Sequence, residues 1–205
     1  MRSNHTAPGV RCLMALLVLL GTGCVTPGPI APKYLDPSFV PTTVDEIVLL
    51  SFVDIRQDKS LPFDLKDFME STTRMGALRK DLENKGYTMS FADDFGQVRT
   101  MSEDEIRAAE VPWVNALGPQ NAKWVMLVGL KDLSVHIGFG KLAATQCLGV
   151  LYYKTSGKAV WSHEARGKAA AGGLGGVLAT DQWMGKDALL SCTAVGLFSQ
   201  LPPKK

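Results

Sequence analysis

Residues that form catalytic and metal sites are scarce in this sequence. Four cysteines and three histidines occur among 205 residues, and neither a G-x-S-x-G nor a G-x-x-x-x-G-K-[ST] motif is present. The charges nearly balance, because 22 lysines and arginines stand against 20 aspartates and glutamates. These shortages argue against a zinc cluster, a nucleophile elbow, a phosphate-binding loop and a basic surface for nucleic acid.

The amino terminus has the pattern of an export signal. Arg2 and Arg11 accompany the apolar run Leu13–Leu20, and the small residues 21–23 precede Cys24. The run is shorter than the ~20 residues that a membrane-spanning helix requires. We therefore expect residues 1–23 to be a signal peptide that is removed after export.

The residues Gly21-Thr-Gly-Cys24 resemble the lipobox of bacterial lipoproteins, with Gly21 in the place where leucine is usual. The resemblance implies that Cys24 receives a lipid and becomes the first residue of the mature chain. Val25 replaces the aspartate that commonly retains lipoproteins at the inner membrane, so the resemblance implies a lipid-anchored outer-membrane protein that faces the periplasm. An ordinary secretory signal cut nearby is the alternative.

A proline-rich segment follows the lipobox. Five prolines lie within residues 25–43, where they interrupt helices and sheet ladders and favour an extended chain. We expect residues 24–44 to be the lipidated cysteine and a tether, and residues 45–205 to form a single α/β domain.

The first half of this domain predicts a βαβ unit. The continuous apolar run 47–53 is typical of a central strand buried on both faces. Apolar residues at helical spacing from Leu65 to Leu82 predict one amphipathic helix of about five to six turns. Gly86 stands where a left-handed helix cap is expected, and residues 87–91 alternate as a strand. The unit should be right-handed.

The second half predicts a hairpin and a last helix. Ser102–Glu105 fits a capping box, a short helix should start at Pro112, and 124–130 predicts another buried strand. Residues 145–153 and 159–166 predict an antiparallel hairpin. The helix 181–201 should bury one face, formed by Trp183, Leu190, Val195, Phe198 and Leu201. The expected fold is a mixed sheet of about five strands with helices packed on it and a C-terminal helix last.

This order of elements resembles small envelope lipoproteins whose domains look like the amino-terminal domain of TolB. The resemblance covers most of residues 45–201 and rests on the strand 47–54, the helix end 85–87, the segment 122–124 and the hairpin 155–161. Relatives of this architecture include an outer-membrane activator of penicillin-binding proteins and the subunit of the curli secretion pore. The resemblance implies binding of other proteins or of itself, without turnover chemistry or a cofactor.

Several patterns with catalytic residue types favour structural explanations. His136 alternates with Val135 and Ile137, which places it on a solvated face, and the consecutive strand residues Ser162-His-Glu164 point to opposite faces. Asp54 with Asp58, or Asp93 with Asp94, could pair only through tertiary structure. Gly172–Gly176 lacks phosphate-loop spacing and predicts a flexible connector. We therefore assign no catalytic, cofactor or metal residue.

Cys147 and Cys192 are the only thiols left after Cys12 leaves with the signal and Cys24 is lipidated. In the oxidising periplasm an even pair favours a disulfide. Two buried, inert thiols are the alternative, since free cysteine is among the most buried residue types.

The sequence thus predicts a non-enzymatic module held at a membrane through lipid on Cys24. Its partner is an unknown envelope protein or a second copy of itself, and nucleic acid is not expected. Two alternatives are a hydrolase whose site forms only in three dimensions, and a carrier of a small apolar ligand.

Overall fold

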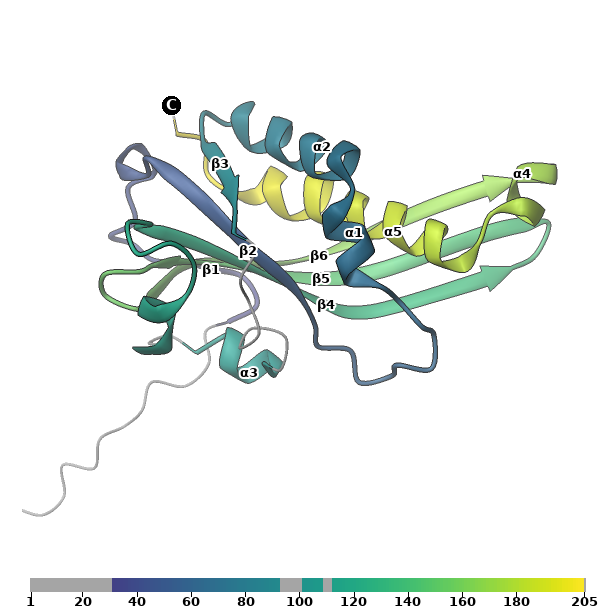
Figure 1. The fold of residues 1–205 in the computed structure, drawn as a ribbon, viewed down its shortest axis with the longest axis horizontal. Coiled ribbons are helices and arrows are strands. Elements are labelled where there is room, and N and C mark those ends of the chain that lie inside the picture. Colours follow the sequence, from purple (N-terminus) through teal and green to yellow (C-terminus); the bar gives the residue numbers. More distant parts are fainter. Residues whose placement is uncertain (1–30, 93–100, 109–111, 205) are drawn as a thin grey trace, which may run out of the picture.

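The computed structural model describes residues 31–92, 101–108 and 112–204 and contains one six-stranded mixed sheet in the order β1-β6-β5-β4-β2-β3 (Figure 1). This confirms the predicted fold class. The strands are β1 (Tyr34–Leu35), β2 (Glu46–Asp54), β3 (Thr88–Phe91), β4 (Trp124–Ile137), β5 (Gly140–Tyr153) and β6 (Lys158–Gly172).

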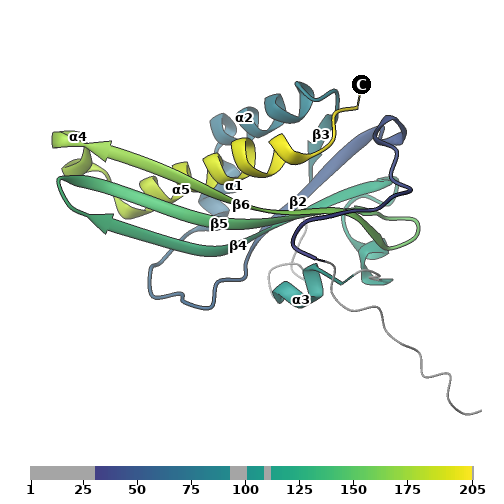
Figure 2. The same ribbon diagram turned by 180° about the vertical axis from the view of Figure 1, so that it is seen from behind.

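Helices cover both faces of the sheet, and the C-terminal helical segment comes last (Figures 1 and 2). The α-helices are α1 (Leu65–Glu70), α2 (Thr72–Glu83), α3 (Glu103–Ile106), α4 (Gly173–Leu178) and α5 (Asp181–Ser191). A π-helical turn (Cys192–Leu197) and a 3-10 turn (Phe198–Gln200) continue α5, and two more 3-10 turns span Pro41–Thr43 and Pro112–Ala116. Within the described ranges, none of the helices has the length and apolar character needed to cross a membrane.

Strand β2 lies inside the sheet, between β3 and β4, and is parallel to both. Its residues alternate between two cores: Leu49 packs with α1, α2 and α5, whereas Leu50 packs with Ile106 of α3 on the other face. The expectation of a central strand buried on both faces is confirmed. Gly86 ends the connection from α2 to β3 with φ +88°, as the predicted cap requires.

The predicted long helix between β2 and β3 is two helices. Ser71 has extended backbone angles and its side chain accepts a hydrogen bond from the amide of Arg74, so it ends α1 and caps α2. A serine favours this arrangement because its oxygen satisfies an amide at the start of the helix. Asp64 caps α1 in the same way. The apolar face is nevertheless shared, since Phe68, Met75 and Leu78 are all buried.

The segment predicted to be a tether is packed on the domain over its described part. Tyr34 and Leu35 pair with β6, Phe39 meets the Trp124 ring at 5.8 Å, and Val44 is fully buried. The proline count hid these contacts because prolines can flank an edge strand without breaking it. The domain therefore begins before residue 45.

Strands β4, β5 and β6 are all longer than the sequence predicts. β4 continues seven residues past Leu130, and β5 and β6 extend with it to a second hairpin turn near Gly138. The sequence does not predict this extension, because its residues lack the continuous apolar character of the runs 47–53 and 124–130.

Two further expectations were wrong. The glycine-rich segment predicted as a flexible connector ends β6 and forms the short helix α4. In the last helix, Phe198 and Leu201 are buried as predicted, but Trp183 and Val195 are exposed, and Met184 and Leu189 are buried instead. The π-helical turn after Ser191 bears on Val195 alone, because it changes the angular spacing only from Cys192 onward.

Candidate interaction surface

Three strands project beyond the rest of the sheet and form an arm (Figures 1 and 2). We define the arm as residues 131–146 of β4 and β5 and residues 163–172 of β6. Pairing of β2 with β4 stops at Leu130, and β1 pairs only with Trp161 and Ser162 of β6. Beyond these points the two outer strands of the arm have no further strand partner among the described residues.

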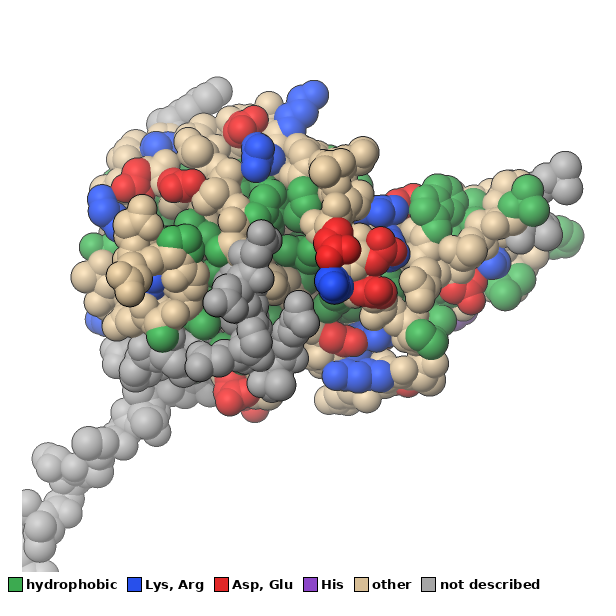
Figure 3. Space-filling model, viewed as in Figure 1, with side chains coloured by type: hydrophobic (Ala, Val, Ile, Leu, Met, Phe, Trp, Pro, Cys, Tyr) green, Lys and Arg blue, Asp and Glu red, His purple; other side chains and the backbone are tan. Residues whose placement is uncertain are grey.

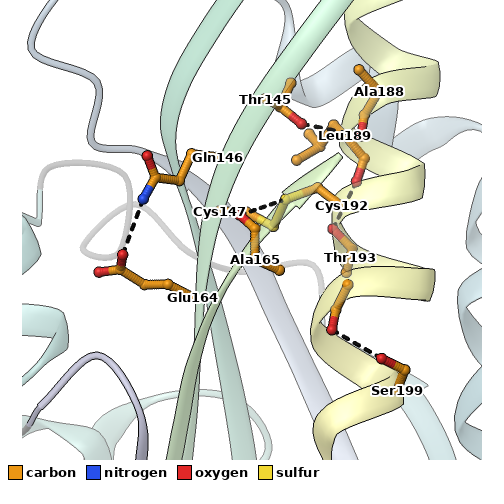
Figure 4. Close-up of a disulfide and its surroundings, with 11 residues drawn as sticks. Thr145, Gln146, Cys147, Glu164, Ala165, Ala188, Leu189, Cys192, Thr193 and Ser199 are labelled. Carbon is orange, nitrogen blue, oxygen red and sulfur yellow. Dashed lines mark hydrogen bonds between the residues drawn. A yellow bond between two sulfur atoms is a disulfide. The ribbon is translucent and has the colours of Figure 1, made fainter. Parts of the chain in front are cut away.

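The inner face of the arm lies against α5. Thr145 donates a hydrogen bond from Oγ1 to the carbonyl of Ala188 at 3.1 Å, and Cys147 lies one step along the same face (Figure 4). Gly167 on β6 allows this close approach, because a Cβ atom there would stand 2.1 Å from the Ala188 carbonyl oxygen. Small residues on this face therefore allow α5 to pack closely against the arm.

The outer face of the arm is polar where it joins the body. Lys131 donates hydrogen bonds from Nζ to Glu103 of α3 at 2.9 Å and to Glu164 of β6 at 2.6 Å, and Gln146 also donates to Glu164 at 3.0 Å. Burial by itself would lower the pKa of Lys131, but the hydrogen bonds with Glu164 and Glu103 raise it above its ordinary value. This cluster joins α3 to the base of the arm.

Rows of residues run straight across the outer face. Asp132 lies opposite Gln146, which lies opposite Arg166; the next row is Ser134, Ala144 and Lys168. Asp132, Arg166 and Lys168 are exposed and form no ion pair within the part of the chain that the structure describes. One edge of the arm thus carries an unpaired negative charge and the other carries two unpaired positive charges.

The far end of the arm is apolar. Ile137 is 76% exposed and Phe139 is fully exposed at the β4–β5 turn, while Leu178 of α4 is 82% exposed and Trp183 of α5 is 47% exposed. Figure 3 shows apolar side chains gathered at this end of the molecule. We call Ile137, Phe139, Leu142, Leu178 and Trp183 the tip. Exposed apolar groups that gather at one end of a fold mark an interaction site.

The residues of the Ser162-His163-Glu164 motif do not converge, as predicted. Ser162 donates a hydrogen bond to the carbonyl of Ala31 at 2.7 Å, and Glu164 accepts from Lys131 on the outer face. His163 points to the opposite face and stacks on Trp161 with ring centroids 6.3 Å apart. Burial, together with the positive charge of Lys33, lowers the pKa of His163.

The other candidate groups are also separate. His136 is exposed as predicted, and so is its apolar neighbour Ile137. Asp54 binds Arg56 through both carboxylate oxygens at 2.9 and 2.8 Å, whereas Asp58 is exposed and caps the turn at Ser60. Asp93 and Asp94 lie outside the described residues, and within the described ranges no three metal-ligating side chains gather.

A cavity of about 600 Å³ opens beside α1 at the carboxyl ends of β2 and β3. Its apolar wall includes Phe52, Phe63, Met69 and Phe91. Its charged groups are already paired, because Asp54 binds Arg56 and Lys66 lies 3.6 Å from Glu70. The volume is within the range of small-molecule sites.

Cys147 of β5 and Cys192, which follows α5, form a disulfide in the structure, with their Cα atoms 6.3 Å apart (Figure 4). Both residues are fully buried. The bond joins the base of the arm to the last helix. The signal peptide and Cys24 lie outside the described residues.

The chain matches no protein-family model and no curated protein. Solved structures that are similar to this chain include a PelC dodecamer from Paraburkholderia phytofirmans, at 13% identity and a TM-score of 0.42, covering 81% of this chain and 94% of that one. A lipoprotein from Neisseria meningitidis is similar at 12% identity and a TM-score of 0.39, covering 62% of this chain and 84% of that one. A Xanthomonas campestris protein of family DUF330 is similar at 8% identity and a TM-score of 0.38, covering 82% and 88%. Likeness at this level carries no inference about partners or activity.

The sequence did not lead us to the tip or to the charged edges. One local signal was present, because Gly138 and Gly140 flank Phe139 and such glycines favour a hairpin turn. The rows across the arm depend on the register of three strands, which residue patterns alone do not fix.

Proposed function

We propose that this protein is a lipid-anchored envelope protein that acts by binding proteins through its arm, without turnover chemistry. The exposed tip carries the proposal. Ile137, Phe139 and Leu178 expose most of their side chains at the end of a projecting structure that the rest of the described fold does not cover. Apolar residues in such a position stabilise a complex, because contact with a partner removes them from water.

The anchor belongs to the same proposal. Lipid on Cys24 would hold the chain at the outer membrane, facing the periplasm, and the seven residues from Cys24 to Ile30 could span at most about 24 Å before the packed segment begins. The packed segment meets β6 at Ser162, which lies at the base of the arm and not at its tip. The tip is therefore available to partners.

The interior of the described fold supports binding over catalysis. Three candidate catalytic groups of the described chain have structural roles: Ser162 holds the packed segment, Glu164 binds Lys131, and Asp54 binds Arg56. A reaction that used one of these three groups would require it to leave its partner.

Photo-cross-linking from the tip tests the proposal. A photoreactive amino acid in place of Phe139 should give a discrete protein adduct in intact cells, and Ile137→Asp in the same chain should abolish that adduct without changing the melting temperature. The same photoreactive group in place of Val195, which is 71% exposed outside the tip, is the matched control and should give no such adduct. A tip that yields no adduct, or one unchanged by Ile137→Asp, would overturn the proposed role.

The cavity favours a second candidate function, the transport or storage of a small apolar ligand. Its aromatic and methionine lining and its volume suit such a ligand. Titration with the apolar dye N-phenyl-1-naphthylamine tests this function. Saturable fluorescence that Met69→Trp abolishes and Val195→Trp leaves intact would support this function. Fluorescence that does not saturate would contradict it.

A further inference from the structure

We infer that the arm joins copies of this chain head to tail, with the β4 edge of one copy against the β6 edge of the next. The inference rests on the proposed binding role of the arm and names a second copy of the chain as a partner. It concerns the edges of the arm, which share Ile137 with the apolar tip but not Phe139, Leu178 or Trp183.

Both edges of the arm offer unpaired backbone. The loop between β2 and α1 crosses the β4 edge near Leu133, since Phe63 and Leu133 both lie against Gly185. The part of the β4 edge left for another strand is therefore 134–137. On the opposite side, residues 163–172 of β6 have no strand partner within the described chain other than β5. Unpaired strand edges present amides and carbonyls that another strand can bind.

The directions of the strands permit head-to-tail pairing. β4 and β6 are both antiparallel to β5, so they run the same way. Two copies in the same orientation can therefore place β4 of one beside β6 of the other as parallel strands. A common membrane anchor would give all copies such an orientation.

The charges at the two edges favour contact between unlike edges. Asp132 at the β4 edge and Arg166 at the β6 edge occupy the same row of the outer face, and Lys168 lies one row further along. Head-to-tail contact brings Asp132 close to Arg166, or to Lys168 after a stagger of two residues. Contact between two β4 edges, or between two β6 edges, gains no such pair of opposite charges and brings only charges of one sign toward each other. Like charges directly opposite are unfavourable.

The inner faces of the two edges also complement each other in size. Val135 and Ile137 at the β4 edge lie in the same rows as Ala169 and Ala171 at the β6 edge. Large side chains would therefore meet small ones, and the contact would cover part of Ile137. Because the two edges are different surfaces, the contact repeats from copy to copy and gives a ring or an open chain.

Paired cysteines test this contact. His136 and Ala170 share a row of the outer face but are separated by β5, about 10 Å apart, which is too far for a disulfide within one copy. Under mild oxidation in the envelope, His136→Cys with Ala170→Cys in one chain should give a ladder of covalent oligomers. Ser134→Cys with Ala170→Cys serves the same purpose if the edges are staggered by two residues. A mixture of the corresponding single variants should stop at dimers.

Charge reversal shows whether the cross-links report the inferred contact. Asp132→Lys alone and Arg166→Asp with Lys168→Asp should each reduce the ladder, and co-expression of the two variants should restore it, because each then meets an opposite charge. The absence of a ladder from both cysteine pairs would overturn the inference. Dimers formed by a single-cysteine variant on its own would also overturn it, as would ladders that the charge-reversal substitutions leave unchanged. The photo-cross-linking experiment at Phe139 is independent, so the tip can retain a partner even where the edges do not join copies.

Discussion

Cys147 and Cys192 join the base of the arm to the end of the last helix across 45 residues of sequence. The helix in between lies directly on the arm, where Thr145 binds the Ala188 carbonyl. A cross-link that closes a loop of this length restricts the unfolded chain, and it typically stabilises a fold by about 2–4 kcal/mol.

Cys147→Ser combined with Cys192→Ser should therefore lower the free energy of unfolding by about 2–4 kcal/mol, measured by urea denaturation. Reduction of the wild-type protein should have a comparable effect and should not change the stability of the double variant. Non-reducing mass spectrometry of protein isolated from the periplasm under oxidising conditions provides the direct check. Two free thiols in that material would contradict the disulfide.

Gly167 should tolerate no side chain. A Cβ atom at this position would stand 2.1 Å from the Ala188 carbonyl oxygen and 2.3 Å from the Cys192 amide nitrogen, so α5 would have to move away from the sheet. Gly167→Ala should cost about 1–3 kcal/mol in chemical denaturation. Gly76→Ala is the matched control, because that position in α2 has no atom within 4 Å of the added carbon and should gain about 0.5–1 kcal/mol. Equal effects of the two substitutions would contradict the packing of α5 on β6.

The fold was predictable where residue patterns reflect burial on both faces. The apolar runs 47–53 and 124–130 marked β2 and the body part of β4, and Gly86 marked the end of α2. The break at Ser71 was not apparent because the apolar spacing of α1 and α2 continues across it. Local capping decided the backbone there, while side-chain periodicity reported only the shared buried face.

The arm was not predictable for a related reason. Only its inner face is covered, and small residues such as Ala143 and Gly167 replace the large apolar ones that normally reveal a strand. The two buried cysteines could be singled out by elimination, but their separation required the tertiary structure. The row that contains Asp132 and Arg166 depends on pairing across three strands, and a register shift near Lys131 changes which face the following residues occupy.

The ion pair between Asp54 and Arg56 predicts that the free energy of unfolding decreases at acidic pH. The side chain of Arg56 is only 3% exposed, so Asp54→Asn should leave a buried cation without its carboxylate and cost about 3 kcal/mol near neutral pH. Burial alone would raise the pKa of Asp54, but the hydrogen bonds and charge of Arg56 lower it below its ordinary value of 3.8. The unfolded chain therefore binds the proton on Asp54 more readily than the folded chain does. The ion pair stabilises the fold fully above the ordinary pKa of Asp54, and this stabilisation is lost as the pH falls through the pKa that Asp54 has in the folded chain.

Urea midpoints at pH 7 and at pH 3 measure this effect. The difference between wild type and Asp54→Asn should shrink at pH 3, while the exposed control Asp104→Asn should differ little from wild type at pH 7. A difference that stays constant between the two pH values would show that the ion pair does not set the acid response.

Loss of the lipid should release the protein from the membrane. Cys24→Ser removes the only thiol that the lipobox resemblance assigns to lipid, and the described chain offers no helix that could span the bilayer. We expect the variant in the soluble fraction of the envelope and the wild type with the outer membrane after density separation. Recovery of the wild type in the inner membrane would contradict the outer-membrane location alone, whereas a variant that stays membrane-bound would contradict the anchor.

Alanine substitutions of the remaining catalytic residue types distinguish a binding module from an enzyme. His136 is exposed on the arm, His163 stacks on Trp161, and Asp93 and Asp94 belong to a segment outside the described residues. We expect each single alanine variant to complement a deletion of the gene as well as the wild-type protein does. Surface changes of this kind usually cost under about 0.5 kcal/mol, and His163→Ala should cost somewhat more because it loses a ring contact. If the His163, Asp93 or Asp94 variant is folded and correctly localised but inactive in this complementation test, an active site should be sought around that residue. An inactive His136 variant would instead be explained by the β4 edge, on which His136 lies.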